Sequence, residues 1–439
     1  MSSNLKSAGN AFSGVYGFLM TAIGCALGIG TIWRFPYSLG ANGGAIYLIV
    51  YVAIIAVIGV PLLAAETAIG FRSQKTAVLA YRELRPDRKI WSLAGYLHFA
   101  AALMIISYTL PIYAWILGYL YNTAAGTFAG LNANGLSSFF KQFSADKPLI
   151  ISLMMLNIAI NMLVLRGGVK KGVELLTKAL LPVLGVIMVV LIIAGLRMEG
   201  ASEGVKYLFE PDYSLFNISS LKNALGQAFY AIGLAILANM VFGSYLKNPD
   251  ENIGKTSVVI CISLVAAGVM AGLMIFPALF ASGLKAQSGV ALVFMTVPLI
   301  FDTMPLGRLM GTLFFLGFYI AALTSSTGVA EAVIGMIMEQ FHMSRKKTLP
   351  FLIAIMTMIG YFALPAGDFF NICDIITSNY LIILGALAIA IFTGWIWGAD
   401  NFVEAINVKN HFVKLWMKIS VKYIAPVVIV IIFVTSIFL

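Results

Sequence analysis

Charged residues are scarce in this sequence. Asp, Glu, Lys and Arg together make up 10% of its 439 residues, whereas 61% are hydrophobic, and the mean hydropathy is +0.96. A soluble domain of this length needs far more polar side chains to cover its surface. The composition therefore excludes a soluble globular protein and predicts an all-α polytopic membrane protein.

Cysteine and histidine are equally scarce, with three residues of each. The cysteines lie far apart in apolar or small-residue surroundings, which is typical of small core residues and not of a disulfide or metal site. The histidines are also scattered, and no nucleophile–base pair or pair of aspartates stands out in the apolar segments. An intramembrane enzyme is therefore not predicted.

A cleavable signal sequence is absent too, because the first dozen residues are polar and the first apolar segment is too long. We expect that segment to be kept as a membrane span. About eleven segments have the length of a span, and no soluble domain is expected between them within residues 1–439. The expected spans are 12–39, 42–70, 90–122, 148–165, 175–196, 220–245, 254–283, 306–340, 348–365, 374–397 and 415–438.

The net charge of +10 comes from basic residues in the short loops between these spans. With the N-terminus inside, 20 lysines and arginines face the cytoplasm, 7 face outward, and Arg34 stays in the membrane. Positive charge favours the cytoplasmic side, so we expect a cytoplasmic N-terminus and an extracellular C-terminus in the cell membrane. The charge is therefore a topology signal, with membrane lipid and not nucleic acid as the partner.

One stretch within the first span, GCALGIGTIWRFPY at residues 24–37, is rich in helix-breaking residues. Glycine costs about 1 kcal/mol relative to alanine in a helix, and Gly24, Gly28 and Gly30 all lie here. Unwound backbone at membrane depth is tolerated only where it lines a protein-enclosed cavity. We therefore expect a broken helix whose free carbonyls face a site for ions and a small solute. The alternative is a glycine-rich face that packs on another helix.

A second interruption is expected in the sixth span, where small residues divide QAFYAIGLAI at residues 227–236. Breaks in the first and sixth of ten spans indicate two five-helix halves of opposite topology. The halves would comprise residues 12–196 and 220–397, with 415–438 as an additional helix.

Five motifs in the chain resemble the neurotransmitter:sodium symporter family, and the similarity is greatest to its bacterial eleven-helix members. They are AxGxGTxWRFPY in the first span, NGG at residues 42–44, RGGVKKGVE at 166–174, LTSS at 323–326 and DIITSN at 374–379. The resemblance covers essentially the whole chain. It implies the LeuT-type inverted repeat with broken helices 1 and 6, and sodium-coupled uptake of an amino acid or related small solute.

The resemblance also implies which residues hold the family's second sodium ion. Backbone carbonyls and two hydroxyls would coordinate it, which suits a hard cation. The residues implied are Gly24, Leu27, Ala321, Thr324 and Ser325. From the residues alone, the two hydroxyls could instead bond to their own helix.

The family's first sodium site is degraded in this chain. The positions of its side-chain ligands are occupied by Thr31, Ala231 and Leu264, and only the threonine offers an oxygen. We therefore expect one sodium ion. Chloride is not expected either, because Gly268 stands where the family has the partner of Tyr51 and Gln227.

The substrate pocket departs from the family pattern as well. The third-span tyrosine that binds a substrate carboxylate is replaced by Thr109, with Tyr108 beside it. Gly28 stands where monoamine carriers have an aspartate, which favours a zwitterion whose carboxylate binds N–H groups near residues 28–30. The resemblance implies a pocket formed by Ala26, Gly28, Ile29, Gly30, Ile105, Thr109, Tyr230, Gly233, Ile236, Ser325 and Val329.

Ionisable residues within apolar segments need partners, since a charge at the bilayer centre costs at least about 2.5–3.5 kcal/mol. The resemblance implies an outer gate in which Arg34 pairs with Asp374, directly or through water, beside Tyr108. It implies an inner gate at Glu339 and Tyr245, where Lys6 is the nearest cation because the family's arginine is absent.

Glu66 and Glu331 are expected to organise helix ends near the broken spans; alternatively, Glu331 carries a proton. The resulting prediction is a one-sodium symporter, and the alternative is a proton-coupled or sodium-independent transporter of another small solute. A channel or a receptor is less well supported, because the pocket is mostly apolar and no signalling domain is visible.

Overall fold

A computed structural model describes residues 11–284, 292–364 and 367–438. Helices make up nearly all of this part of the chain, and one isolated β-bridge joins Gly44 to Pro211 within it. The all-helical fold expected from the sequence is therefore confirmed.

The first half of the chain forms helices whose junctions often contain a π-turn. They are α1 (Val15–Ala26), η1 (Gly30–Arg34), α2 (Phe35–Ala41), α3 (Ala45–Ile54), η2 (Ile55–Gly59), α4 (Val60–Ser73), α5 (Ala77–Leu84), η3 (Lys89–Trp91), α6 (Ser92–Tyr108), α7 (Leu110–Ala125), α8 (Ala133–Ala145), α9 (Lys147–Arg166), η4 (Val169–Val173) and α10 (Glu174–Leu196).

The second half repeats this pattern. Its elements are α11 (Ala201–Phe209), α12 (Ile218–Ala231), α13 (Ala238–Tyr245), α14 (Ile253–Ala281), η5 (Leu292–Thr296), α15 (Val297–Thr303), α16 (Gly307–Gln340), α17 (Arg345–Phe362), α18 (Asp368–Ile375), η6 (Ile376–Leu381), α19 (Ile382–Ile391), η7 (Phe392–Ile396), α20 (Ala399–Ala405), α21 (His411–Ile419), η8 (Ser420–Ile424) and α22 (Ala425–Phe438).

Eight helical segments of the described chain are long and apolar enough to span a membrane, and the bent pair made by α1 and η1–α2 is a ninth. The two other segments expected to be spans are less regular. One is divided into α12 and α13, and the other, α17, begins with three basic residues. The chain is thus a multi-pass membrane protein, while the count of eleven spans stays a prediction.

The first span is broken where the glycines predict it. α1 ends at Ala26, and the chain resumes as η1 and α2 after a bend of 59°. Across the break Gly28 donates its N–H to the carbonyl of Ala26 at 2.8 Å, and Thr31 donates to Gly28 at 3.1 Å. In a continuous helix these two N–H groups would bond to Gly24 and Leu27, so both carbonyls lose their helical donors.

The sixth span is broken between α12 and α13, as the small residues predict. Gly233, Ala235 and Leu237 have φ values of 60°, 60° and 71°. Positive φ is easy for glycine but costs alanine or leucine roughly 1–2 kcal/mol. Contacts from neighbouring helices must therefore hold this segment in place.

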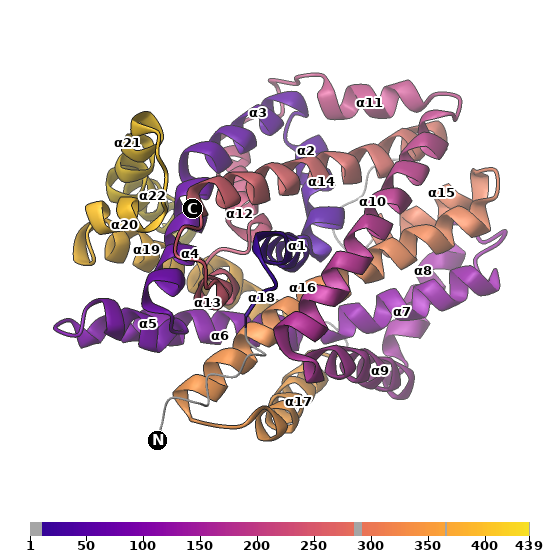
Figure 1. Cartoon of the computed structure of the whole chain (residues 1–439). Coiled ribbons are helices and arrows are strands. Elements are labelled where there is room, and N and C mark those ends of the chain that lie inside the picture. The colour runs from indigo at the N-terminus through magenta and orange to yellow at the C-terminus, as the bar shows by residue number, and fades with distance from the viewer. Residues whose placement is uncertain (1–10, 285–291, 365–366, 439) are drawn as a thin grey trace.

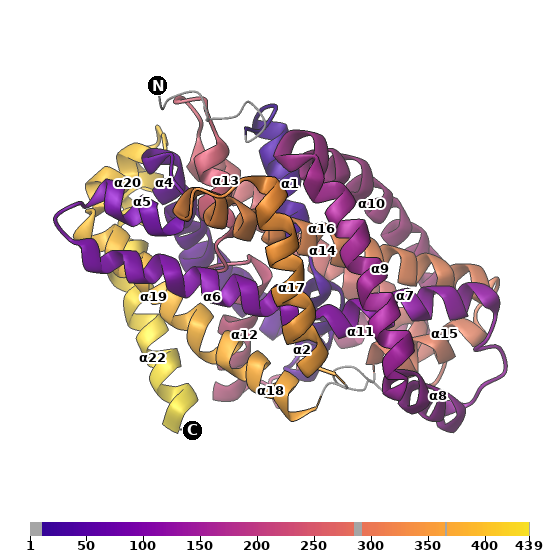
Figure 2. The ribbon, with the colours of Figure 1, turned by 90° about the horizontal axis from the view of Figure 1, so that it is seen from below.

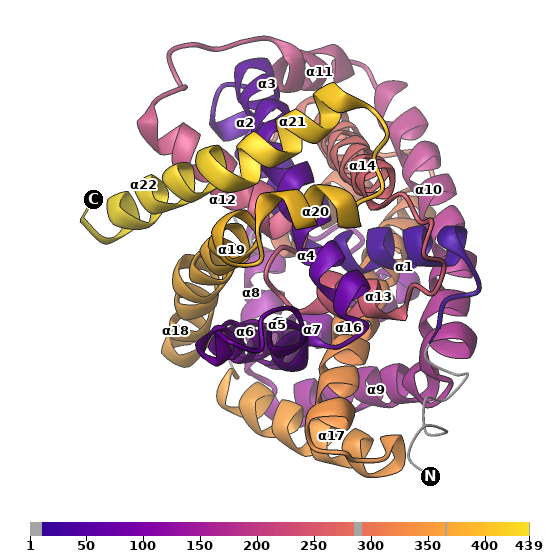
Figure 3. The same ribbon diagram turned by 60° about the vertical axis from the view of Figure 1, so that its left-hand side comes forward.

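The broken helix α1 lies at the centre of the molecule, surrounded by the other helices (Figure 1). It packs against α16, α10 and α14, so the unwound residues are enclosed by protein and not by lipid. In Figure 2, α4, α5, α13 and α20 lie towards one end, and α2, α12 and α18 towards the other. Figure 3 shows α22 at the edge of the molecule, where it packs on α19.

The NGG motif forms the junction between α2 and α3. Gly43 and Gly44 have φ values of 97° and 58°, and a Cβ atom on Gly44 would lie 2.6 Å from the carbonyl oxygen of Glu210. Only glycine fits such close backbone packing. The motif therefore joins the outer half of the first span to the segment that follows α11.

Candidate functional site

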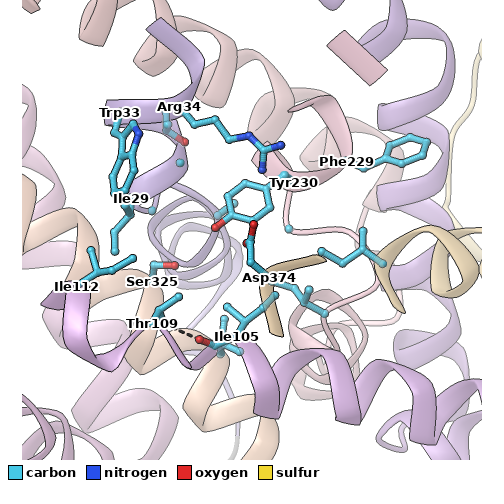
Figure 4. A pocket seen from close by; sticks show the side chains of 18 of the residues that line it. Ile29, Trp33, Arg34, Ile105, Thr109, Ile112, Phe229, Tyr230, Ser325 and Asp374 are labelled. Carbon is cyan, nitrogen blue, oxygen red and sulfur yellow. Dashed lines mark hydrogen bonds between the residues drawn. The ribbon is translucent and has the colours of Figure 1, made fainter. Parts of the chain in front are cut away.

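A cavity of about 370 Å³ lies between the two broken helices, α6–α7, α16 and the start of the α18–α19 span. Every residue that the sequence predicted for the substrate pocket lines it. Figure 4 shows Ile29, Ile105, Thr109, Tyr230 and Ser325 around the cavity, with Arg34 above the tyrosine ring. The set comprises Ala26, Gly28, Ile29, Gly30, Ile105, Thr109, Tyr230, Gly233, Ile236, Ser325 and Val329.

Other lining residues were not predicted. Ile112, Tyr113, Phe229, Trp33 and Phe370 add apolar and aromatic surface. Ile112, Tyr113 and Phe370 lie outside the motifs, and nothing in their sequence pattern separates them from core residues, whereas Trp33 and Phe229 lie within the two predicted helix breaks. The result is a cavity whose walls are mostly apolar.

Two hydroxyl groups of the third span that border the cavity are already engaged. Thr109, which replaces the family's tyrosine, donates its hydroxyl to the carbonyl of Ile105 one turn earlier. The neighbouring Tyr108 donates its hydroxyl to a carboxylate oxygen of Asp374 at 2.9 Å. Neither hydroxyl replaces the missing tyrosine, because each already has a protein acceptor.

Arg34 and Asp374, which were predicted to form an outer gate, both line the cavity, but no ion pair joins them in the described part of the chain. The Arg34 guanidinium instead lies 5.4 Å from the centre of the Tyr230 ring, a cation–π contact. Its side chain is exposed, so the cavity reaches solvent at this end. The direct pairing that the resemblance implies is thus not formed in this conformation.

The residues implied for the second sodium site meet where α1 breaks against α16. A Cβ atom on Gly24 would lie 3.4 Å from the Cβ atom of Thr324, and one on Gly28 would lie 2.9 Å from the hydroxyl oxygen of Ser325. Gly24, whose carbonyl lacks its helical donor, therefore lies close to Thr324, and the unwound residue Gly28 lies close to the Ser325 hydroxyl.

Thr324 does bond to its own helix, as the alternative interpretation held. Its hydroxyl donates to the carbonyls of Ile320 and Ala321, at 3.0 and 3.2 Å. This donation occupies the hydrogen and leaves the oxygen lone pairs available. The back-bonding and the cation site are therefore compatible, and the donor set of carbonyl and hydroxyl oxygens fits a sodium ion.

The residues at the degraded first site do not fit a second sodium ion. The Thr31 hydroxyl is buried without a hydrogen-bond partner among the described residues, and Ala231 and Leu264 are buried with no polar side-chain atom. At the position linked to chloride in the family, a Cβ atom on Gly268 would lie 2.8 Å from the ring of Phe35. An aromatic ring therefore stands beside Gly268, where the family has a polar partner.

At the predicted inner gate, Glu339 has partners that were not predicted from the sequence. Lys6, the expected cation, lies outside the described residues. Glu339 accepts the backbone N–H of Thr76 at 2.6 Å and lies 3.5 Å from the ammonium of Lys75. Its partners are thus at the start of α5, while the Tyr245 hydroxyl is buried without a described partner.

A second ion pair closes the same end of the molecule, and it was missed from the sequence. The two terminal guanidinium nitrogens of Arg345 donate to the two carboxylate oxygens of Glu331, at 2.7 and 2.5 Å. Arg345 also donates to the carbonyl of Leu165 at 2.8 Å. Glu331 is fully buried. A bidentate pair of this kind favours the ionised carboxylate, while the alternative in which Glu331 carries a proton stays a prediction.

Glu66 organises the break in helix 6, as expected for its position. It accepts the N–H of Ala235 at 3.3 Å and the side-chain amide of Asn239 at 3.2 Å. The same amide reaches the carbonyl of Gly233 at 3.0 Å. Asn239 was not predicted, although a lone asparagine in an apolar stretch was a visible signal.

Comparison with known proteins gives one consistent result. The model of the sodium:neurotransmitter symporter family matches residues 9–134 and 131–439. An uncharacterized sodium-dependent transporter, YhdH, of Bacillus subtilis is 33% identical, with 95% of each chain covered. The sodium-dependent nutrient amino acid transporter 1 of Drosophila melanogaster is 24% identical over 95% of this chain and 76% of its own.

A solved structure is similar over nearly the whole fold. The crystal structure of MhsT in complex with L-phenylalanine superposes with a TM-score of 0.88 and 36% identity, covering 97% of this chain and 99% of that one. Its LeuT-like architecture agrees with the broken helices and central cavity described above. On the family match, the relatives and the fold together, this chain belongs to the sodium:neurotransmitter symporter family.

Proposed function

We propose that this protein is a symporter that uses one sodium ion to import an amino acid with an apolar side chain. The observation that carries the proposal is that the helix break, which frees the Gly24 and Leu27 carbonyls, packs against Thr324 and Ser325 of α16. One sodium ion crossing about 100 mV releases about 2.3 kcal/mol. That free energy supports roughly 50-fold accumulation of a neutral solute, so one site suffices.

The proposed substrate class follows from the walls of the cavity. Ile105, Ile236 and Val329 offer hydrocarbon surface, and Tyr230 and Phe229 offer aromatic surface. The N-terminal end of η1, near Gly28, would receive the substrate carboxylate. MhsT, with a similar fold, was crystallised with L-phenylalanine, which supports an apolar amino acid here.

The proposed orientation places the end containing α5 and α13 in the cytoplasm. The basic loops support it. The ion pairs of Glu339 and Glu331 would then form the closed cytoplasmic gate, and the cavity beside Arg34 would face outward.

The test is uptake into proteoliposomes with a panel of labelled amino acids and amines, with and without a sodium gradient. We expect accumulation of L-phenylalanine or a related apolar amino acid that disappears when sodium is replaced by potassium. Uptake indifferent to sodium but abolished by collapse of a proton gradient would instead establish the proton-coupled alternative.

A further inference from the structure

His98 is a buried histidine on α6 that has no role in the proposed sodium or substrate contacts. It is fully buried, and both of its ring nitrogens have partners. Nδ1 lies 3.1 Å from the carbonyl oxygen of Ala235, and Nε2 lies 3.0 Å from the hydroxyl of Tyr81. It therefore touches the break in helix 6 on one side and the helix α5 on the other.

The chemistry of the partners decides the direction of both hydrogen bonds. A carbonyl oxygen only accepts, so Nδ1 carries the proton and donates it to Ala235. Nε2 of a neutral imidazole is then an acceptor, and the Tyr81 hydroxyl must donate to it. The ring thus links two groups that would otherwise be buried without partners.

The carbonyl that His98 holds belongs to a strained residue. Ala235 has a φ of 60°, and its N–H is bound by Glu66. Both polar groups of this peptide segment are therefore held from outside the helix, by a side chain of α4 and a side chain of α6. The adjacent residues Gly233, Leu234 and Ile236 line the substrate cavity, and we call them its floor. The contacts of Glu66 and His98 with Ala235 therefore fix the position of this floor.

The other end of the link reaches the inner gate. Tyr81 lies on α5, and Lys75 and Thr76, which directly precede this helix, bind Glu339. At the C-terminal end of α5, Arg85 donates a hydrogen bond to the carbonyl of Ile396. Arg85 also donates hydrogen bonds to the Asp87 carboxylate, which lower the pKa of Asp87 to about 2. α5 is therefore anchored at both ends and joined in the middle to the floor of the cavity.

The link is packed without spare room. A Cβ atom on Gly385 of α19 would lie 2.8 Å from the Cβ atom of Ala235 and 3.0 Å from Nδ1 of His98. The Tyr81 ring packs edge-on against Phe392, with centroids 4.6 Å apart. Rigid packing of this kind passes a displacement from one side to the other.

We propose that His98 is a positioning residue for transport, which ties the floor of the substrate cavity to α5 and so couples substrate binding to the inner gate. This inference rests on the transport function proposed above. Loss of the hydrogen bond between Tyr81 and His98 would leave the substrate cavity formed. It would, however, remove the connection between the cavity and the Glu339 contacts of the inner gate.

Tyr81→Phe tests the link with little change in packing, because it removes only the hydroxyl. We expect the maximal uptake rate of L-phenylalanine in proteoliposomes to fall about tenfold, while its equilibrium binding stays within about threefold of wild type. The matched control is Tyr319→Phe, which removes another buried hydroxyl, bonded to Asn157 at 3.2 Å. It should transport as wild type does.

His98→Asn supplies the second test, because asparagine keeps a donor near Nδ1 and has no group at Nε2. If the two residues act as one link, the double variant with Tyr81→Phe is no slower than either single variant. Independent, multiplying losses would contradict the proposal, as would wild-type turnover in Tyr81→Phe.

Hydrogen–deuterium exchange in the absence of any transported solute tests the Tyr81–His98–Ala235 link independently of the proposed transport function. Tyr81→Phe should speed exchange in both 77–84 and 232–237, and unchanged exchange would refute the link. A wild-type protein that accumulates none of the amino acids would refute the proposed function while leaving this measurement valid.

Discussion

Ser325 lies where its side chain can contact both the proposed sodium ion and the proposed substrate. It lines the substrate cavity, and its hydroxyl oxygen would lie 2.9 Å from a Cβ atom on Gly28. Its neighbour Ser326 points elsewhere, bonding to Asn161 at 2.9 Å and to the carbonyl of Leu323. Two adjacent serines thus differ in whether they face the site.

Ser325→Ala removes one oxygen from the proposed sodium site. We expect the sodium concentration for half-maximal uptake to rise about tenfold, since a contact to a charged group contributes roughly 1.5 kcal/mol or more. A sodium titration of uptake measures it. Ser326→Ala is the control and should leave the value unchanged; an unchanged value for Ser325→Ala would remove that serine from the site.

Gly28→Ala should block the cavity at its centre. The added methyl group would meet the Ser325 side chain, which has to move away from the sodium and substrate positions. We expect binding of L-phenylalanine to weaken at least about tenfold, measured by equilibrium binding to purified protein. The control is Gly185→Ala on α10, where nothing lies within 4 Å; equal weakening in both variants would contradict the argument.

The cavity-lining residues could be predicted because short motifs carry them in a known order. Gly28 and Ser325 belong to such motifs, and both line the cavity, as does Thr109, which the resemblance over the whole chain implied. Arg345 and Asn239 could not be assigned in this way. Their roles depend on partners distant in sequence or on the path of an unwound segment, and neither is visible as a spacing.

At the scale of elements, the two helix breaks have different causes. The first is built on glycines and was predictable from them. The second places Ala235 and Leu237 at positive φ, where no sequence rule would put them. The strain there is offset by Glu66, Asn239 and His98, so the conformation is a tertiary effect.

The junction between α2 and α3 supplies the prediction for this scale. Gly44→Ala places a Cβ atom 2.6 Å from the carbonyl oxygen of Glu210 at a φ of 58°. We expect the free energy of unfolding to fall by at least ~2 kcal/mol, seen as a lower Tm of detergent-purified protein. Gly226→Ala, in the interior of α12 with nothing within 4 Å, should not lower the Tm. An unshifted Tm for Gly44→Ala would contradict the assigned backbone packing.

At the scale of the whole molecule, the cavity has access to solvent at one end, and ion pairs hold the helices together at the other. The cavity reaches the exposed Arg34 at one end. At the other end Glu339 holds α5, Glu331 holds Arg345, and Phe12 packs against Phe242. The fold class and the breaks were predictable from the sequence, but the state of the gates was not. Alternative conformations share one sequence and differ by only a few kcal/mol.

Glu339→Gln weakens the hold on α5 and should shift the population towards a conformation open at this end. Labelling of a cysteine introduced by Ser244→Cys, at a buried position on α13, should become faster by severalfold. Glu203→Gln, which breaks the exposed Glu203–Lys206 pair on α11, is the control. Equal labelling rates in the two variants would show that Glu339 does not hold the gate.

The short distance between α1 and α16 also bears on which cation this protein admits. With Gly24 so near Thr324, the freed carbonyls and the hydroxyls can approach a small ion closely. Potassium is larger and would have to push apart two helices that are packed against each other at the centre of the bundle. We therefore expect the proposed site to favour sodium over potassium, because the absence of a side chain at residue 24 allows α1 to pack against Thr177 of α10 and Thr324 of α16.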